Sequence, residues 1–389
     1  MRQEIGDLVH QVDAQIVVVD AHMHVHAADQ HAAGRRAVFA VDIRIALLGR
    51  RLLPVPIAER MAGGGDDAEA VSPRHLGDAA AQANQLLAHL AGMAADLDVF
   101  ISSSTDPLLF LEYHRQFTHS LIFVPIGALI VALCLWPFLK RSLQPKELLT
   151  ACFLGYLSHG LLDACTTYGT QLLWPFTDDR VAWNVISIVD PLFTLPLLIA
   201  VALGVRAKRV NAWPRIGLIW LFAYLGAGEI QRQRAETVGH EVAKARGHAP
   251  SRLDAKPGFA QLLLWKIVYE YEGQFFVDGV RAGIQTKVYP GTHIPKLDSQ
   301  WAEANLPPNS QTRQDFERFR WFSNDYLALS TSQPNTIIDV RYSMNINEIR
   351  PLWSIQFDPS KPWTHVDYLT HRDLDPSTTA QFQRMLMGQ

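Results

Sequence analysis

The uneven placement of apolar residues constrains this chain more than any other feature. Overall 48% of the residues are hydrophobic and 19% are charged, but the apolar residues concentrate between Ser120 and Ile230. The first hydrophobic stretch, Leu121–Leu139, contains 19 residues without a charge. This is about the length that crosses a hydrocarbon core of roughly 30 Å. We therefore expect an integral membrane protein.

Three further hydrophobic stretches follow, and together the four predict a membrane bundle of about four hydrophobic helices. They are Leu148–Cys165, Val185–Val205 and the shorter Ile216–Ala227. The three cysteines, Cys134, Cys152 and Cys165, fall in or beside these stretches without CxxC spacing. We interpret them as small apolar helix residues and not as a disulfide framework.

Basic residues suggest a topology for these helices. Lys and Arg concentrate in the loops 140–147 and 206–215. Because loops rich in Lys and Arg stay in the cytoplasm, both loops are predicted to lie inside the cell. The start of the first helix, the loop 166–184 and the C-terminal part then face the outer side of a bacterial inner membrane, which the chain crosses several times.

The two flanks of the hydrophobic region differ from each other. Residues 1–90 show no sustained helical or strand period, and their acidic start lacks the apolar core of a signal peptide. We expect this segment to be disordered, or foreign sequence joined near Leu87–Ala91. The net charge is −3 and no long basic run is present, so no nucleic-acid partner is expected.

The C-terminal part is predicted to be a soluble α+β domain. A charged helix is expected over Gln231–Gly247, and residues 267–284 alternate around Glu272-Gly273 as a hairpin does. Residues 336–344 and 352–357 resemble further strands. The predicted division is 1–90 for the atypical segment, 91–230 for the membrane-embedded domain and 231–389 for the soluble domain.

Ionisable residues inside the apolar stretches suggest a shared site. His159 and Asp163 are four residues apart, so they project from one helix face. An ionisable side chain in a membrane helix costs at least ~2.5 kcal/mol on insertion scales, so it faces a partner or a wet cavity. Asp190 lies at the same depth of the next helix, and Asp96 and Asp98 form an acidic patch upstream.

The predicted topology brings these groups together. His114 and His119 precede the first helix at its outward end, where His159, Asp163 and Asp190 also lie. Imidazole and carboxylate are the ligands that zinc, manganese and iron accept. Each residue also has an ordinary interpretation: a packing histidine, a helix start at Asp190-Pro191, or contact of His114 and Arg115 with lipid head groups.

Two stretches, HRQFTHSL (114–121) and GYLSHGLLDACTTYGTQLLWPF (155–176), resemble the YdjM-like family of bacterial inner-membrane proteins, described as membrane-bound metal-dependent hydrolases. The family pattern places Asp-x-Asp before His-Arg-x-x-Thr-His-Ser, then Ser-His-x-x-x-Asp, Thr-x-x-Gly and Trp-Pro-Phe. The matching residues are Asp96, Asp98, His114, Arg115, Thr118, His119, Ser120, Ser158, His159, Asp163, Thr166, Gly169, Trp174, Pro175 and Phe176. The resemblance covers residues 91–230, and 1–90 lacks the short helix that opens the family pattern.

The resemblance implies metal-assisted hydrolysis but no particular substrate; the expected place of the site at the outer membrane surface suggests a lipid-linked or phosphoester substrate. The metal ligands are then Asp98, His114, His119, His159 and Asp163, holding one or two ions of zinc, manganese or iron. Asp96 or Asp190 is the candidate general base. The planar fork of Arg115 suits an anionic group such as a phosphate.

Three alternatives compete with this interpretation. The chain can be a non-catalytic membrane scaffold or adaptor whose polar cluster is structural. It can be a transporter, although four helices without an inverted repeat make this weaker. The run VVVDAHMHVH (17–26) resembles the first metal motif of amidohydrolase barrels, but such a barrel needs about 200 residues of alternating strand and helix.

Overall fold

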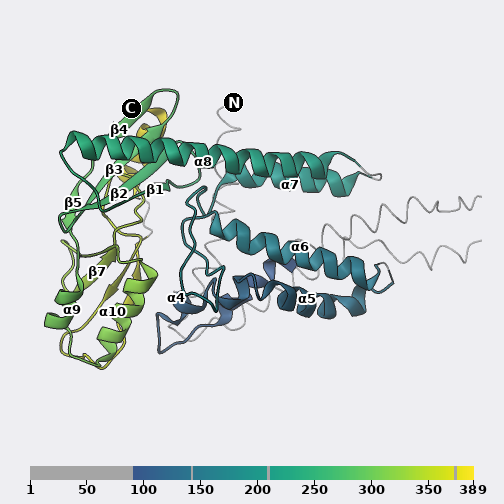
Figure 1. Cartoon of the computed structure of the whole chain (residues 1–389), viewed down its shortest axis with the longest axis horizontal. Helices are drawn as coiled ribbons and strands as arrows, with labels where there is room; N and C mark the ends of the chain where they lie inside the picture. The colour runs from purple at the N-terminus through teal and green to yellow at the C-terminus, as the bar shows by residue number, and fades with distance from the viewer. Residues whose placement is uncertain (1–90, 142, 208–210, 372–374) are drawn as a thin grey trace, which may run out of the picture. The chain divides into compact units, whose positions relative to one another are not determined.

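The computed structural model describes residues 91–141, 143–207, 211–371 and 375–389. The expectations for residues 1–90, including the run at 17–26, lie outside the described residues. Helices dominate the first half of the described chain and two antiparallel sheets dominate the second (Figure 1). This confirms the predicted order of a helical part followed by a sheet-rich C-terminal domain.

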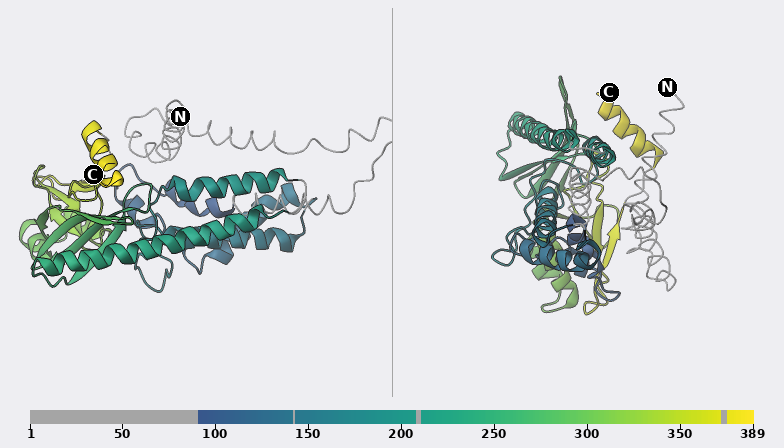
Figure 2. Two further views of the ribbon diagram at one scale, coloured as in Figure 1. Left: turned by 90° about the horizontal axis from the view of Figure 1, so that it is seen from above. Right: turned by 90° about the vertical axis from the view of Figure 1, so that its right-hand side faces the viewer.

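The helical part is built from the following elements. They are η2 (Ala95–Phe100), α4 (Leu109–Tyr113), η3 (Phe117–His119), α5 (Val124–Leu139), α6 (Pro145–Ala164), α7 (Pro191–Arg206) and α8 (Trp213–Ala245). Helices α5 and α6 pack as one antiparallel hairpin, and α7 and α8 pack as a second. Both hairpins extend away from the C-terminal domain in each of the side views (Figures 1 and 2).

Small residues let α5 and α6 approach each other closely. Ala128 and Ala132 of α5 are buried against Cys152 and Tyr156 of α6. The turn before α6 is closed by Gln144 and Glu147, which form a capping box around Pro145. All three cysteines of the chain are free, as expected for apolar helix residues.

Two helix boundaries differ from those expected. Residues 185–189 are not helical, because α7 begins only at Pro191, with Asp190 as its N-cap. Helix α8 runs without a break through the predicted boundary at residue 230, since no proline interrupts it beyond its first turn. The expected short span and the expected charged helix are therefore one helix of 33 residues.

Among the described residues, no single helix combines the length and apolarity that a bilayer crossing requires. One bent pair, Leu109–His119 with Val124–Leu139, meets the requirement when its two parts are taken together, with a bend of 84° between them.

The first sheet begins the C-terminal domain. Its strands are β1 (Arg252–Pro257), β2 (Leu264–Tyr271), β3 (Gln274–Ala282), β4 (Thr286–Tyr289) and β5 (His293–Pro295). Tyr271 pairs with Gln274 across a turn in which Glu272 and Gly273 have φ values of 47° and 70°, so the predicted hairpin is confirmed. The polar half of α8 covers this sheet through Ala235 and Ala243.

The second sheet packs against helices and completes the domain. Its elements and neighbours are α9 (Ser299–Asn305), α10 (Gln311–Phe322), β6 (Leu327–Leu329), β7 (Thr336–Asp339), β8 (Trp353–Gln356), β9 (Asp367–Thr370) and α11 (Pro376–Met387). Strands β7 and β8 confirm the two strands expected at 336–344 and 352–357. Leu108 and Leu111, from the region around α4, are buried in the same core as Phe316 and Phe319 of α10. The helical part therefore contributes residues to the core of the sheet domain.

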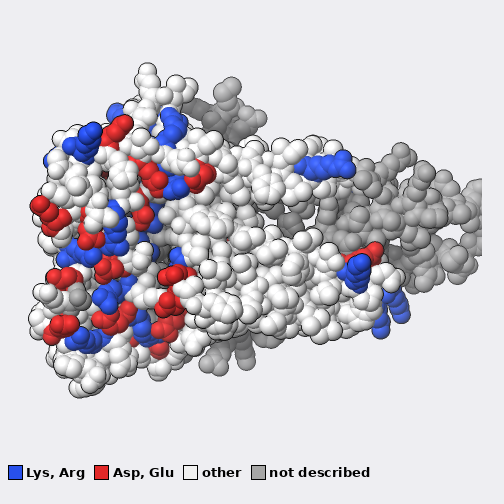
Figure 3. Space-filling model, viewed as in Figure 1, with Lys and Arg blue, Asp and Glu red and all other residues white. Residues whose placement is uncertain are grey.

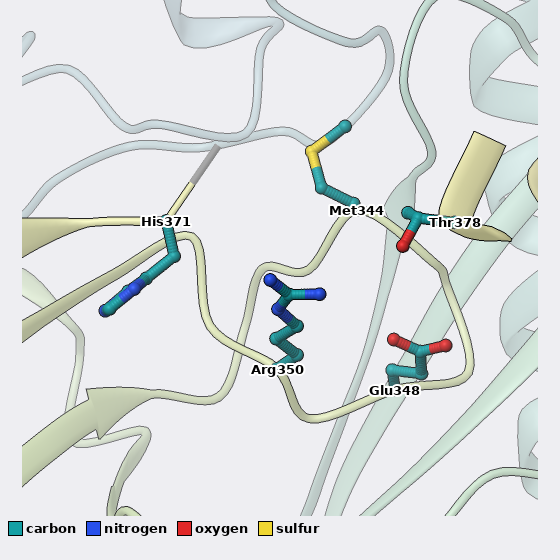
Figure 4. Close-up of a pocket in the computed structure, with 5 residues that line it drawn as sticks. All are labelled: Met344, Glu348, Arg350, His371 and Thr378. Atoms are coloured by element: carbon teal, nitrogen blue, oxygen red, sulfur yellow. The ribbon is translucent and has the colours of Figure 1, made fainter. Parts of the chain in front are cut away.

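A buried lysine connects the first sheet to the segment after β7. Lys266 of β2 is 3% exposed, and its Nζ donates to Ser343 Oγ at 2.8 Å and to the Glu348 carbonyl at 2.7 Å. Met344, Glu348 and Arg350 of this segment line a small pocket together with His371 and Thr378 (Figure 4). That pocket has a volume of ≈ 10 Å³, about the minimum for one water molecule, so it is too small for a substrate.

Lys266 makes the stability of the protein depend on pH. Burial lowers the pKa of its ammonium to about 7, whereas an unfolded lysine titrates near about 10.4. Between these values the unfolded chain binds more protons, so the free energy of unfolding rises with pH. We expect Lys266→Met to reduce this rise by up to about 1.4 kcal/mol per pH unit, measured by denaturant unfolding at pH 7.5 and 9.5. Lys287→Met, on exposed β4, is the control, and an equal slope in wild type and Lys266→Met would contradict the assignment.

Candidate metal centre

Four short segments meet at one end of the α5–α6 hairpin. They are η2, the residues after α4, η3 and the last turn of α6. Their approach depends on Gly160, because a Cβ atom there would lie 2.7 Å from the carbonyl oxygen of His119. Since α5 and α6 are antiparallel, His119 at the entry to α5 lies beside His159 and Asp163 at the end of α6.

Four side-chain atoms from these segments converge on one point. They are Asp96 Oδ1, His119 Nε2, His159 Nε2 and Asp163 Oδ2. His119 Nε2 lies 3.1 Å from Asp163 Oδ2, 3.2 Å from His159 Nε2 and 3.4 Å from Asp96 Oδ1. His159 Nε2 lies 3.2 Å from Asp96 Oδ1 and 3.6 Å from Asp163 Oδ2.

These separations are those of a tetrahedral ligand set. Zinc bonds to nitrogen and oxygen of about 2.0–2.2 Å place tetrahedral ligands about 3.3–3.6 Å apart. Asp163 Oδ2 is buried and lies 3.2 Å from Arg115 Nε and 3.1 Å from His119 Nε2, but neither contact has the geometry of a hydrogen bond, so this oxygen can still bind a cation. The residues present therefore fit a divalent ion held by two imidazoles and two carboxylates.

Asp98 lies behind this cluster and orients it. Its side chain is fully buried. Oδ1 lies 2.8 Å from His114 Nδ1. Oδ2 accepts from the Arg115 amide at 2.9 Å and Thr118 Oγ1 at 2.7 Å, and lies 3.2 Å from His119 Nδ1. A carboxylate on Nδ1 leaves Nε2 of His119 free to face a metal, which is the usual outer-shell arrangement.

His114 belongs to a second, looser group. Asp96, Asp98 and His114 each offer an atom that lies within 4.8 Å of the others, so this group can hold an ion as well. Both oxygens of Asp98 already accept hydrogen bonds, however, whereas Asp163 Oδ2 of the first group accepts none. The first group is therefore the better metal site.

The turn between α4 and η3 is strained in a way that serves Asp98. Arg115 has a φ of 63°, a left-handed conformation that costs a non-glycine residue energy and concentrates at functional sites. This conformation directs the Arg115 amide to Asp98. The Arg115 side chain is 10% exposed, with Nε 3.2 Å from Asp163 Oδ2 and Nη1 donating to Thr166 Oγ1 at 3.0 Å.

The acids of η2 are ionised in this environment. Burial works against the charge of Asp96, but hydrogen bonds from His119 and His159 outweigh it and hold the pKa of Asp96 well below its usual range. Burial likewise opposes the charge of Asp98, and the hydrogen bonds from His114 and His119 again lower the pKa. The Asp96 side chain is 48% exposed while that of His119 is fully buried, so the cluster is open to solvent on the Asp96 side.

Asp190 does not join the cluster. Its carboxylate accepts from the backbone amides of Leu192 and Phe193 at 3.1 and 3.3 Å, and from Tyr224 Oη at 2.8 Å. It therefore caps α7 and ties it to α8. The sequence predicted Asp190 at the outward end of its helix, together with His159 and Asp163. That position alone does not distinguish a helix cap from a metal ligand.

Sequence reasoning did not single out Tyr168 and Arg180, which surround Arg115 and His114. The Arg115 and Arg180 guanidinium carbons lie 5.2 and 5.1 Å from the Tyr168 ring centroid, and the His114 ring lies 5.6 Å from it. Arg180 Nη2 donates to the carbonyls of His114 and Gly169. Tyr168, the aromatic residue of the motif TTYGT, was the sequence feature that could have indicated this group of side chains.

Comparison with known proteins matches the segment that carries these residues. Residues 68–235 match the YdjM inner membrane protein family. The match confirms the predicted resemblance to this family and begins at residue 68, ahead of the junction expected near Leu87–Ala91. Residues 68–90 lie outside the described structure.

One relative among curated proteins carries no known activity. The uncharacterized protein YfhP of Bacillus subtilis (strain 168) is 29% identical over 119 residues, which cover 30% of this chain and 36% of YfhP. The chain thus spans about a third of the length of the curated relative that it matches. No solved structure matches the chain.

Asp98→Asn tests the orienting role of this buried carboxylate. The amide keeps the size of the side chain but removes the charge that holds Nδ1 of His114 and His119. We expect zinc affinity to fall about 10- to 100-fold, as for other outer-shell partners, in a competition titration against a chelator. Asp178→Asn, at an exposed position, is the matched control. Unchanged affinity in folded Asp98→Asn would contradict this role.

Proposed function

We propose that this protein is an inner-membrane, metal-dependent hydrolase. Its first-choice ligands are Asp96, His119, His159 and Asp163. The proposal rests on one observation: four donor atoms from three separate segments lie at the spacing of a tetrahedral coordination shell. The family match over residues 68–235 supports the membrane location.

Each side chain of the site has a distinct part in the proposed reaction. A divalent ion supplies a Lewis acid that polarises the scissile bond and lowers the pKa of water to about 7. Asp96, the most exposed carboxylate of the cluster, would bind the ion through Oδ1, and its other oxygen is the candidate base for the attacking water. Asp98 and His114 hold the buried imidazole of His119 in place. Asp190 caps α7 and receives no catalytic role.

Arg115 is proposed to bind an anionic substrate group. Its Nε lies 3.2 Å from Asp163 Oδ2, an atom assigned to the metal, so its guanidinium is beside the reacting centre. The guanidinium fork matches two oxygens of a phosphoryl group. A phosphoester, either lipid-linked or free, is therefore the proposed substrate class.

A membrane location follows from the distribution of charge. On the face shown in Figure 3, charged side chains gather over the C-terminal domain, while the helices are almost free of charge up to their far ends. Large apolar side chains such as Ile130, Leu154 and Phe222 are half exposed or more, as expected where lipid is the solvent. The site lies opposite the basic helix ends, on the side proposed to face outward.

The second candidate function is a scaffold in which the ion is structural. Four protein ligands fill a tetrahedral shell, and closed shells are typical of structural zinc sites. In that case loss of metal unfolds the protein and no substrate is turned over. Solvent access at Asp96 favours the hydrolase.

Metal content and phosphodiester turnover distinguish the two. We expect detergent-purified wild type to hold near-stoichiometric zinc, manganese or iron, and His159→Ala and Asp163→Ala to lose it. His240→Ala, an exposed position on α8, is the control. With bis(p-nitrophenyl) phosphate, Arg115→Met should raise KM more than it lowers kcat, because it removes an anion contact.

Three outcomes are informative. Metal with turnover supports the hydrolase. Metal without turnover of any phosphoester, together with unfolding on chelation, supports the scaffold. A well-folded wild type that binds none of the three metals when they are supplied would overturn both.

A further inference from the structure

Helix α4, which ends just before His114, is held in place by a side chain of the C-terminal domain. Arg318 of α10 donates from Nη1 and Nη2 to the two oxygens of Asp106, each at 2.9 Å. Its Nε donates to Glu112 Oε1 at 2.5 Å. Asp106 precedes α4 and Glu112 lies within it, so one guanidinium holds α4 at both ends.

Arg318 is itself fixed within its own domain. Its Nη1 donates to Asp315 Oδ1 at 3.0 Å, and Asp315 has a fully buried side chain. The other Asp315 oxygen lies 2.9 Å from His365 Nδ1 and accepts from the Val366 amide at 3.1 Å. An arginine restrained by three carboxylates has little freedom to release α4.

The residue types at this place also resemble a metal site. Asp106, Asp315 and His365 each offer an atom within 4.8 Å of the others. The guanidinium of Arg318 already lies within 3.0 Å of both carboxylates, where a cation would bind. The cluster is therefore an ion-pair clamp.

Apolar packing acts in the same direction as the clamp. Leu108 and Leu111 are 0% and 2% exposed, in a core shared with Phe316 and Phe322 of α10. From the opposite side, Arg180 donates to the carbonyls of Leu111 and His114 at 3.2 and 3.4 Å. Helix α4 is thus enclosed by the C-terminal domain and the loop after α6.

The restraint on α4 extends directly to the metal cluster. His114 is the C-cap of α4, and Arg115 follows it. The His114 imidazole and the Arg115 backbone amide both contact the Asp98 carboxylate. Oδ2 of the same carboxylate lies 3.2 Å from Nδ1 of His119. A displacement of α4 therefore reaches a metal ligand through one carboxylate.

We propose that Arg318 is a positioning residue of the metal centre, and that the C-terminal domain is a necessary part of the site. This inference rests on the proposed metal centre. It goes beyond the family match, which ends at residue 235, because it assigns a role to a residue more than 80 positions further along the chain. The domain acts by fixing α4 and contributes no metal ligand.

The test uses the full chain in detergent with four single variants and the double variant Asp106→Asn/Arg318→Met. Arg318→Met removes the fork and Arg318→Lys keeps only the charge. Asp106→Asn weakens the clamp from the α4 side and is the milder change, should Arg318→Met fail to fold. Arg320→Met is the control, since Arg320 lies on the same helix and, within the described part of the chain, forms an ion pair with Glu317 of that helix. Zinc affinity, thermal unfolding and hydrogen exchange of residues 106–120 are measured for each.

We expect Arg318→Met to weaken zinc binding about tenfold, the lower end for outer-shell partners, and to speed exchange across 106–120. Arg318→Lys should restore part of the affinity, Asp106→Asn should lose a smaller amount, and the double variant should lose no more than Arg318→Met alone. The control should match wild type in affinity and exchange.

Other results overturn the proposal. Faster exchange with unchanged zinc affinity shows that the clamp holds α4 but does not position the site. Unchanged exchange and affinity show that it does neither, and both results leave the proposed hydrolase intact. If wild type binds no metal, the proposed function fails and this inference fails with it.

Discussion

The buried carboxylate of Asp98 is the interaction on which the candidate site depends. A carboxylate without water must have its oxygens satisfied by donors from the protein, because an unpaired buried charge is strongly unfavourable. Here the donors come from the end of α4, from the Arg115 amide and from Thr118. Satisfying Asp98 therefore fixes the path of the chain from η2 to η3. The strained φ of Arg115 is one consequence of this path.

Local periodicity was enough to predict much of the fold and part of the site. His159 and Asp163 are four residues apart on a helix, and their atoms meet as that spacing predicts. The hairpin at Glu272-Gly273 follows from alternation on both sides of two residues that accept positive φ. His119 lies beside His159 because the end of α6 in an antiparallel hairpin returns to the level at which α5 began. These signals depend on residues close in sequence or on helix direction.

The remainder could not be read from the sequence, for physical reasons. Whether a histidine is a ligand or an orienting group depends on which ring nitrogen faces the carboxylate, and sequence does not encode this directly. The sequence predicted Asp190 and Asp163 at the same outward helix ends, yet one caps a helix and the other faces the cluster. The clamp joins Asp106 to Arg318 across 212 positions, a separation at which no periodic pattern carries information.

The distribution of solvent around the cluster bears on what an ion there can do. His119 is fully buried, while His159 and Asp163 are 19% and 15% exposed at the side chain. Asp96 is 48% exposed, so a water or substrate oxygen approaches the cluster most readily beside this carboxylate. A structural ion needs no such opening, since closed shells keep water out. A cluster whose candidate base is its most exposed residue suits the proposed hydrolysis, because nucleophile, base and ion must meet at one point.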